Sequence, residues 1–147
     1  MTNQIIEAIT TAIGNEFGDG YNIYIEQIEQ ELDEPCFFVH QINGKHDLFL
    51  WNRYHDTHHF DVQYFPGTES IQTECNSVSD RLEQALEYIF MYDSEQQLEK
   101  KPIRGTNIHS DIQDGVLHFF IDYNGFVIKQ VELGSMKTVS QNISVRE

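Results

Sequence analysis

The densest group of metal-capable side chains in the sequence is the heptapeptide HDTHHFD at residues 55–61. Three imidazoles and two carboxylates can ligate zinc or manganese when the fold supplies a defined geometry and supporting hydrogen bonds. The spacing differs from the HExxH pattern, which places two histidines on one face of a helix. Most of the heptapeptide also falls between two predicted strands. We therefore predict a polar turn and no metal site, with a metal hydrolase that uses His55, His58 and His59 as the alternative.

His118 interrupts an otherwise apolar stretch, and Asp111 is its cross-strand neighbour in the register predicted below. A histidine beside a carboxylate can act as a general base. The pattern brings no serine or cysteine nucleophile and no glycine-rich elbow to this pair. The glycines of the N-terminal region follow a helix, not a strand, so they do not form a phosphate-binding loop. The sequence favours a structural or interfacial His118, and predicts no catalytic activity and no cofactor.

The sequence contains two cysteines, Cys36 and Cys75, and neither belongs to a CxxC pair. A disulfide scaffold or a zinc ribbon requires denser cysteine spacing. Cys36 follows Pro35 in an apolar run, which is typical of a buried thiol. We expect two free thiols.

The composition predicts a compact, soluble and acidic domain. The 147 residues include nine Lys and Arg against 24 Asp and Glu, and the net charge is -15. So few dispersed cations disfavour wrapping of nucleic acid. The charge fits simple solubility, mimicry of DNA, or a surface past which DNA slides. We expect a cytoplasmic location in the producing cell, because no apolar run approaches the roughly 20 residues of a membrane span and MTNQIIEAIT lacks a secretory pattern.

Hydrophobic spacing predicts two helices. The first covers residues 3 to 17, where isoleucines recur at helical intervals and Gly18 and Gly20 follow the last turn. The second covers residues 77 to 92, with Ser77 and Asp80 as a capping pair. Because the first helix has one apolar stripe and is marginal alone, it must pack on a partner surface, most simply a sheet.

Alternating apolar residues predict strands between the two helices. These strands cover residues 21–28, 36–42, 48–54 and 59–65. Asn43-Gly44 is the expected turn between the second and third strands, and Pro66-Gly67 ends the fourth.

The segment from Ile103 to Leu133 contains the turn dipeptides Asp114-Gly115 and Asn124-Gly125, each flanked by β-branched and aromatic residues. Two such turns predict a three-stranded meander, with Ile112 opposite Leu117 and Tyr123 opposite Phe126. Because side chains alternate across a strand, one face collects Ile108, Ile112, Leu117, Phe119, Ile121, Tyr123, Phe126 and Ile128. The other face collects His109, Asp111, His118, Phe120, Asp122 and Lys129. This mixed face is typical of a surface that meets water, a helix edge or another subunit.

These elements predict an α+β fold, with an antiparallel sheet of about five to seven strands and two flanking helices in the order α-β-β-β-β-α-β-β-(β). We expect a single domain over residues 1–133. Residues 134–147 are expected to form a C-terminal arm or an added edge strand.

Several stretches of the sequence resemble one protein family when taken in order. They are IYIEQIEQEL at 23–32, EPCFFV at 34–39, FDVQYFP at 60–66, Arg104-Gly105 and DGVLHFFIDYNGFV at 114–127. Their succession is similar to that of the small prophage tail terminators of Gram-positive bacteria, which belong to contractile-tailed phages and phage-tail-like particles. The resemblance spans nearly the whole chain and implies a sheet flanked by helices.

The resemblance implies a structural protein of the virion, at the head-proximal end of the tail and assembled in the bacterial cytoplasm. It implies a ring, expected to be hexameric, that sits on the tail tube and stops tube growth. The ring would offer a docking surface to the head or neck, contact sheath and neck proteins, and let DNA pass without specific binding. We expect its assembly interface to include Arg104, His109, Asp111, His118, Phe120 and Asp122. The alternatives are a neck or connector protein and an acidic DNA-mimic inhibitor.

Overall fold

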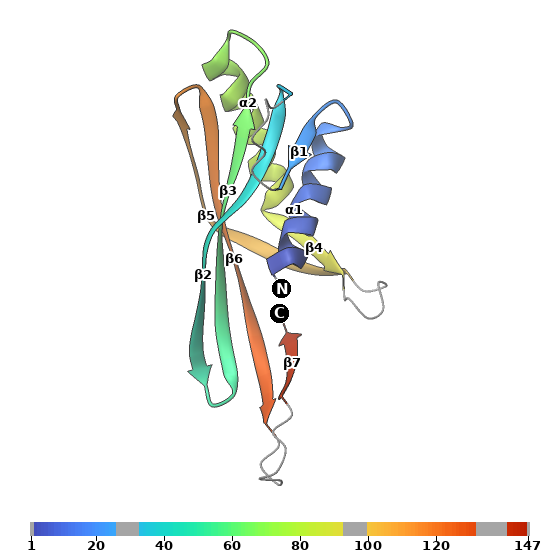
Figure 1. Ribbon diagram of the computed structural model, residues 1–147, viewed down its shortest axis with the longest axis vertical. Coiled ribbons are helices and arrows are strands. Elements are labelled where there is room, and N and C mark those ends of the chain that lie inside the picture. Colours follow the sequence, from blue (N-terminus) through green and yellow to red (C-terminus); the bar gives the residue numbers. More distant parts are fainter. Residues whose placement is uncertain (1, 26–32, 93–99, 132–140, 147) are drawn as a thin grey trace.

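The computed structural model describes residues 2–25, 33–92, 100–131 and 141–146. Two helices pack on one face of a long, twisted sheet (Figure 1). The elements are α1 (Thr2–Phe17), β1 (Asn22–Tyr24), β2 (Cys36–Leu50), β3 (Arg53–Phe65), α2 (Ile71–Leu86), β4 (Tyr88–Tyr92), β5 (Lys100–Gln113), β6 (Val116–Val131) and β7 (Gln141–Arg146). The predicted α+β class is confirmed. Three strands separate the helices where four were predicted, and the C-terminal part of the predicted strand at 21–28 lies outside the described residues.

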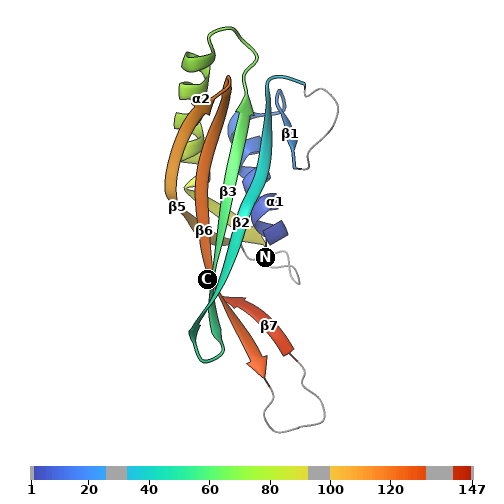
Figure 2. The same ribbon diagram turned by 60° about the vertical axis from the view of Figure 1, so that its left-hand side comes forward.

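The sheet has the order β1-β2-β3-β6-β5-β4, and β1 pairs with β2 in parallel while the other pairs are antiparallel. The first residues of β5, 100–104, pair with β4. From Gly105 onward β5 pairs with β6. The strand β7 pairs with the free end of β6 from Phe126 onward (Figure 2). In the C-terminal segment, residues 134–140 lie outside the described part of the chain and residues 141–146 form β7.

The helix α1 follows the isoleucine spacing of the sequence. Its buried side chains are Ile5, Ala8, Ile9, Ile13 and Phe17. Gly18 adopts a left-handed conformation, φ 82°, and its N–H donates to the carbonyl of Gly14 at 2.9 Å, which ends the helix. The helix predicted over residues 3 to 17 is confirmed. No helix in the described parts of the chain has the length and apolar character that a membrane crossing requires.

The second helix is displaced from its predicted position at residues 77–92. It begins at Ile71 and ends at Leu86, and residues 88–92 form the strand β4. Within this strand Ile89 and Met91 are buried while Tyr88 and Phe90 are about half exposed, so the run alternates with a period of two. The partner strand β5 supplies the pairing that turns this aromatic and β-branched run into a strand.

The hairpin of β2 and β3 replaces three predicted strands. Asn43-Gly44 is not a turn but lies inside β2, just after a bulge between Gln41 and Asn43. The chain turns instead at Trp51-Asn52, since Leu50 pairs with Arg53. The hairpin extends beyond the helices (Figure 1), so its outer part has no core to face and accepts polar residues on both sides. For this reason the polar residues at Asn43-Gly44 and at 55–58, which predict turns, lie inside β2 and β3.

The turn at Asp114-Gly115 is confirmed. Both residues have positive φ, 53° and 76°, as a two-residue hairpin turn requires, and Ile112 pairs with Leu117.

The turn predicted at Asn124-Gly125 is wrong, because β6 continues through it and pairs with β3 along its length. The continuous strand moves later residues to the opposite face from the predicted one. Val127 is 5% exposed and joins the buried face, whereas Phe126 is 41% exposed and lies with Ile128 on the face away from the helices. Lys129 correspondingly lies over the Tyr54 ring on the helix side, 4.4 Å from the ring centroid.

Tyr123 connects β6 to the end of α2 by a hydrogen bond, which its buried hydroxyl donates to the carbonyl of Leu86 at 2.6 Å. Tyr123→Phe leaves this helix-terminal carbonyl without its donor, so we expect a loss of about 1–3 kcal/mol in the free energy of unfolding, measured by urea denaturation. Tyr88→Phe changes a half-exposed tyrosine and should stay within about 0.5 kcal/mol of the natural chain. Equal values for the two variants would contradict this role for the hydroxyl.

Candidate assembly surfaces

The sheet face turned away from the helices carries most of the residues predicted to form an interface. The pairings of β5, β6 and β3 place His109, Asp111, His118, Phe120 and Asp122 on this outer face. His109 and Asp111 are exposed, and the Phe120 ring stacks on the His109 ring with their centroids 4.8 Å apart. Arg104 is separate from this group, since it lies at the bend of β5 over the ring of Tyr88.

Two histidine–aspartate pairs connect β3 to β6 on the outer face. His118 Nδ1 lies 2.9 Å from Asp61 Oδ2, and His59 Nδ1 lies 2.6 Å from Asp122 Oδ1. Asp111 is the cross-strand neighbour of His118, as predicted, but the carboxylate bonded to His118 belongs to Asp61. Sequence reasoning missed this partner, because it had no means of placing β3 beside β6. Both pairs join neighbouring strands and hold the outer face in one arrangement.

The HDTHHFD heptapeptide forms part of β3 and is not a turn. Strand alternation sends His55, His59 and Asp61 to the outer face, and Asp56 and His58 to the helix side. Across the described ranges, no three histidine, cysteine, aspartate or glutamate side chains converge where they could hold a metal ion.

The two cysteines are free, as predicted, and both are buried, whereas the sequence predicts burial for Cys36 alone. Burial raises the pKa of the Cys36 thiol to about 11, and nearby Glu34 and Asp33 add to this shift. Burial likewise raises the pKa of the Cys75 thiol. Both groups therefore stay protonated at neutral pH, which disfavours nucleophilic or redox roles.

His58 is buried between the start of α1 and β2. Its Nδ1 lies 3.4 Å from Thr2 Oγ1 and 3.5 Å from Gln41 Nε2, while its Nε2 has no hydrogen-bond partner. Burial lowers the pKa of His58, and the charge of Asp56 offsets this only in part. The imidazole is therefore neutral in the folded protein at neutral pH.

We expect His58 to make the fold less stable in acid. The unfolded chain takes up a proton on this imidazole near pH 6.5, whereas the folded chain resists it, so stability falls as the pH drops below about 6.5. His58→Gln removes this contribution. Between pH 6.5 and 5.5 the variant should lose up to about 1 kcal/mol less than the natural chain, measured by urea denaturation at each pH. Parallel pH profiles for the two proteins would refute the assignment.

The far end of the β2–β3 hairpin presents four consecutive large apolar side chains to solvent. Leu48, Phe49 and Leu50 are each 62% exposed and Trp51 is 74% exposed. Phe126 of β6 lies beside them, with its ring edge-to-face against Phe49 at a centroid distance of 5.4 Å. Exposed large apolar side chains gathered at one end of a domain are typical of an interaction site. The sequence contains the signal, an apolar run without alternation, which the prediction includes in the strand at residues 48–54.

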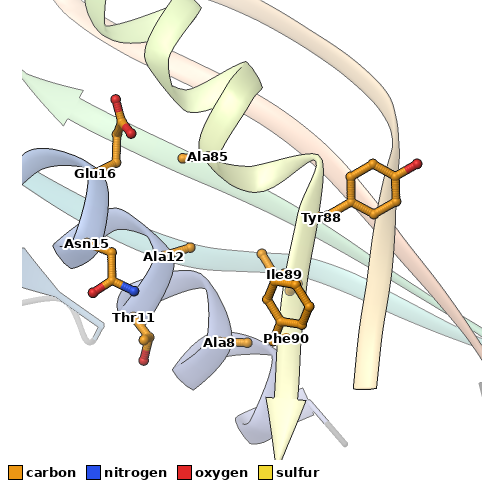
Figure 3. Close-up of a pocket in the computed structure, with 9 residues that line it drawn as sticks. All are labelled: Ala8, Thr11, Ala12, Asn15, Glu16, Ala85, Tyr88, Ile89 and Phe90. Atoms are coloured by element: carbon orange, nitrogen blue, oxygen red, sulfur yellow. The ribbon is translucent and has the colours of Figure 1, made fainter. Parts of the chain in front are cut away.

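A groove of about 290 Å³ lies where α1, the end of α2 and β4 meet (Figure 3). The small side chains of Ala8, Ala12 and Ala85 keep it open. Phe90 of β4 borders it, and Tyr88 lies at its end next to α2. Both aromatic side chains are about half exposed. The groove is small for a drug-sized ligand, since such sites span about 300–1,000 Å³, and its size suits one or two protein side chains.

A domain that exposes an apolar hairpin end, and that also has a groove of mixed polar and apolar lining sized for a side chain, has the make-up of an assembly component. The chain matches the family model of the phage tail terminator protein over residues 4–134, and it belongs to that family. A search of the curated proteins finds no match. The predicted tail terminator family is confirmed, whereas the Gram-positive host and the contractile tail stay predictions. Membership assigns a structural role in the phage tail, as a component of the virion that interacts with other tail proteins.

Proposed function

We propose that the chain assembles as a hexameric ring on the last ring of the tail tube, stops tube polymerisation and provides the docking surface for the neck or head. The family match over residues 4–134 carries this proposal. The exposed hairpin end supports the proposal, because a protein partner that covers these apolar side chains removes them from water. Such a surface is unusual on a domain with a net charge of -15. The protein then works at the head-proximal end of the virion tail, after assembly in the bacterial cytoplasm.

The outer sheet face is the proposed second contact surface of the ring. His109, Asp111, His118, Phe120 and Asp122 share this face. Arg104, which lies apart from them at the bend of β5, is a further proposed contact residue. The histidine–aspartate pairs fix the polar groups between the strands, so Phe120 and the exposed His109 can meet a neighbour without rearrangement. The neighbour is another copy, the tube protein, or a sheath or neck protein of a contractile tail from a Gram-positive host.

The acidity of the chain fits a ring through which DNA passes. A domain with 24 acidic and nine basic residues repels the phosphate backbone, so DNA can cross the lumen without specific binding. The same argument supports a passive structural part and not an enzyme that acts on nucleic acid.

Deletion of the gene tests the proposal. Electron microscopy should show tails of uncontrolled length, or heads without tails, and a plasmid copy of the gene should restore uniform particles. Uniform particles from the deletion strain would remove the terminator role. Cryo-electron microscopy of intact particles separates the alternatives. A neck or connector protein would sit above an already capped tube, and a DNA-mimic inhibitor would be absent from the particle and would compete with duplex DNA for a host protein.

A further inference from the structure

Trp51 occupies a backbone position that does not suit it. It is the first of the two residues that join β2 to β3, and it has a left-handed conformation, φ 50°. Glycine normally stands at such a turn position, because a bulky residue with positive φ is strained. The turn itself therefore gives no reason for a tryptophan. A strained residue that is also 74% exposed indicates a function outside its own fold.

The hairpin end contrasts in charge with the rest of this acidic chain. From Leu48 to Arg53 the sequence reads LFLWNR, with one cation and no anion. Two copies with a net charge of -15 each repel one another in general, so they can approach most easily where the local charge is neutral or positive. The hairpin end is such a place.

The groove between α1 and β4 complements the hairpin end. Its lining from α1, α2 and β4 combines alanines with Ile89, Tyr88 and Phe90, against which an inserted indole can pack. Glu16 borders the groove and also pairs with Arg81, and Glu7 lines a smaller hollow beside it with Thr11 and Phe90. Because Arg81 already neutralises Glu16, the acidic side of the rim is that of Glu7, which Arg53 of an approaching hairpin can meet.

We propose that Trp51, at the tip of the hairpin end Leu48–Trp51 of one copy, inserts its side chain into the α1–β4 groove of the next copy. The inference rests on the proposed ring and names the contact that builds it. The end of the β2–β3 hairpin lies away from α1 and β4 (Figure 1). Trp51 is 74% exposed, so the hairpin end does not fill the groove of its own chain. A contact between two different surfaces joins copies head to tail, and it closes into a ring when the rotation between copies allows.

Two variants break the contact from opposite sides. Trp51→Gly removes the indole and suits the left-handed turn, so folding is retained. Thr11→Arg blocks the groove from an exposed position of α1. Each should raise the Kd for self-association at least about 30-fold, as expected for a central tryptophan contact. Ile71→Ser removes an exposed apolar side chain elsewhere and should change the Kd less than about threefold. Circular dichroism confirms folding of all three.

Mixing the variants gives a sharper result. The Trp51→Gly chain retains the groove and the Thr11→Arg chain retains the hairpin end, so an equimolar mixture can form one productive contact per pair. Native mass spectrometry should show heterodimers and no larger species. Larger mixed species would contradict the head-to-tail contact.

Cross-linking tests the contact in the assembled protein. Benzoylphenylalanine in place of Trp51 should join, in purified tails or in the purified chain, to an α1 or β4 peptide of a second copy. A cross-link to the tube protein or to another segment, or no product between copies in either sample, overturns the inference. The terminator function is judged separately by tail length. If the tails have uniform length but Trp51 cross-links elsewhere, the proposed contact is wrong and the terminator function stands. If the expected cross-link forms but tail length is not controlled, the contact stands and the terminator function is wrong.

Discussion

Phe119→Ala is expected to lower the free energy of unfolding by about 3–5 kcal/mol. Phe119 is completely buried on the helix side of β6, where it pairs with Val62 of β3 in the middle of the sheet. Truncation removes the burial of an aromatic ring and leaves a cavity that the long neighbouring strands cannot readily close. Because a domain of this size is stable by about 5–15 kcal/mol, the variant should lose much of its margin, as urea denaturation will show.

Phe120→Ala is the matched control, one residue along the same strand. Phe120 lies on the outer face, partly exposed and stacked on His109. Its truncation should spare folding and weaken assembly, measured as loss of ring formation or of uniform tail length. A larger stability loss for Phe120→Ala than for Phe119→Ala would mean that the register of β6 is shifted by one residue.

The two turn dipeptides show what local sequence can and cannot predict. Asp114-Gly115 joins β5 to β6 because both residues adopt the positive φ that this turn needs. Asn124-Gly125 has similar turn chemistry, yet Gly125 pairs with Asp56 in the middle of a long ladder. The presence of β3 along the whole of β6 decides the outcome. That neighbour is distant in the sequence, so local turn propensity could not reveal it.

The predicted position of the second helix, residues 77–92, is wrong for a related reason. The apolar residues from Leu82 to Met91 fit a helical period and a strand period at different points, and local spacing favours the helix. In the structure, hydrogen bonds from Tyr123 and Gly105 to the carbonyls of Leu86 and Glu87 mark the point where α2 ends. Those donors come from β6 and β5. The boundary is therefore a tertiary feature.

The candidate surfaces also differ in how far the sequence alone could predict them. Alternation alone was enough to group His118, Phe120 and Asp122 on one face. The prediction of a strand over residues 48–54 does not reveal the exposed hairpin end, because no local rule shows that a hairpin extends beyond the helices that would cover it. The groove requires α1 and β4 to meet, which no spacing in the sequence shows.

Gly105→Ala is expected to destabilise the fold by about 1–3 kcal/mol, because it overpacks the point where β5 leaves β6 for β4. A methyl group on Gly105 would clash with the end of Ile121, approaching its Cγ1 to 2.8 Å, and would lie 3.2 Å from the carbonyl oxygen of Leu86. The backbone cannot easily shift away, since the N–H of Gly105 donates to the carbonyl of Glu87 at 2.6 Å. Urea denaturation of the variant measures the loss.

Ile121→Val tests whether this close approach causes the loss. In the natural chain, removing the terminal methyl of a fully buried isoleucine should cost about 0.5–1.5 kcal/mol. In the Gly105→Ala chain the same change removes Cδ1, the Ile121 atom nearest to the added methyl group, and so relieves the closer part of the clash. It should therefore cost less there, or even stabilise the fold. The double-mutant cycle should give a favourable coupling of at least about 0.5 kcal/mol between the two sites. Strictly additive losses would show that the glycine is needed for some reason other than the space that Ile121 occupies.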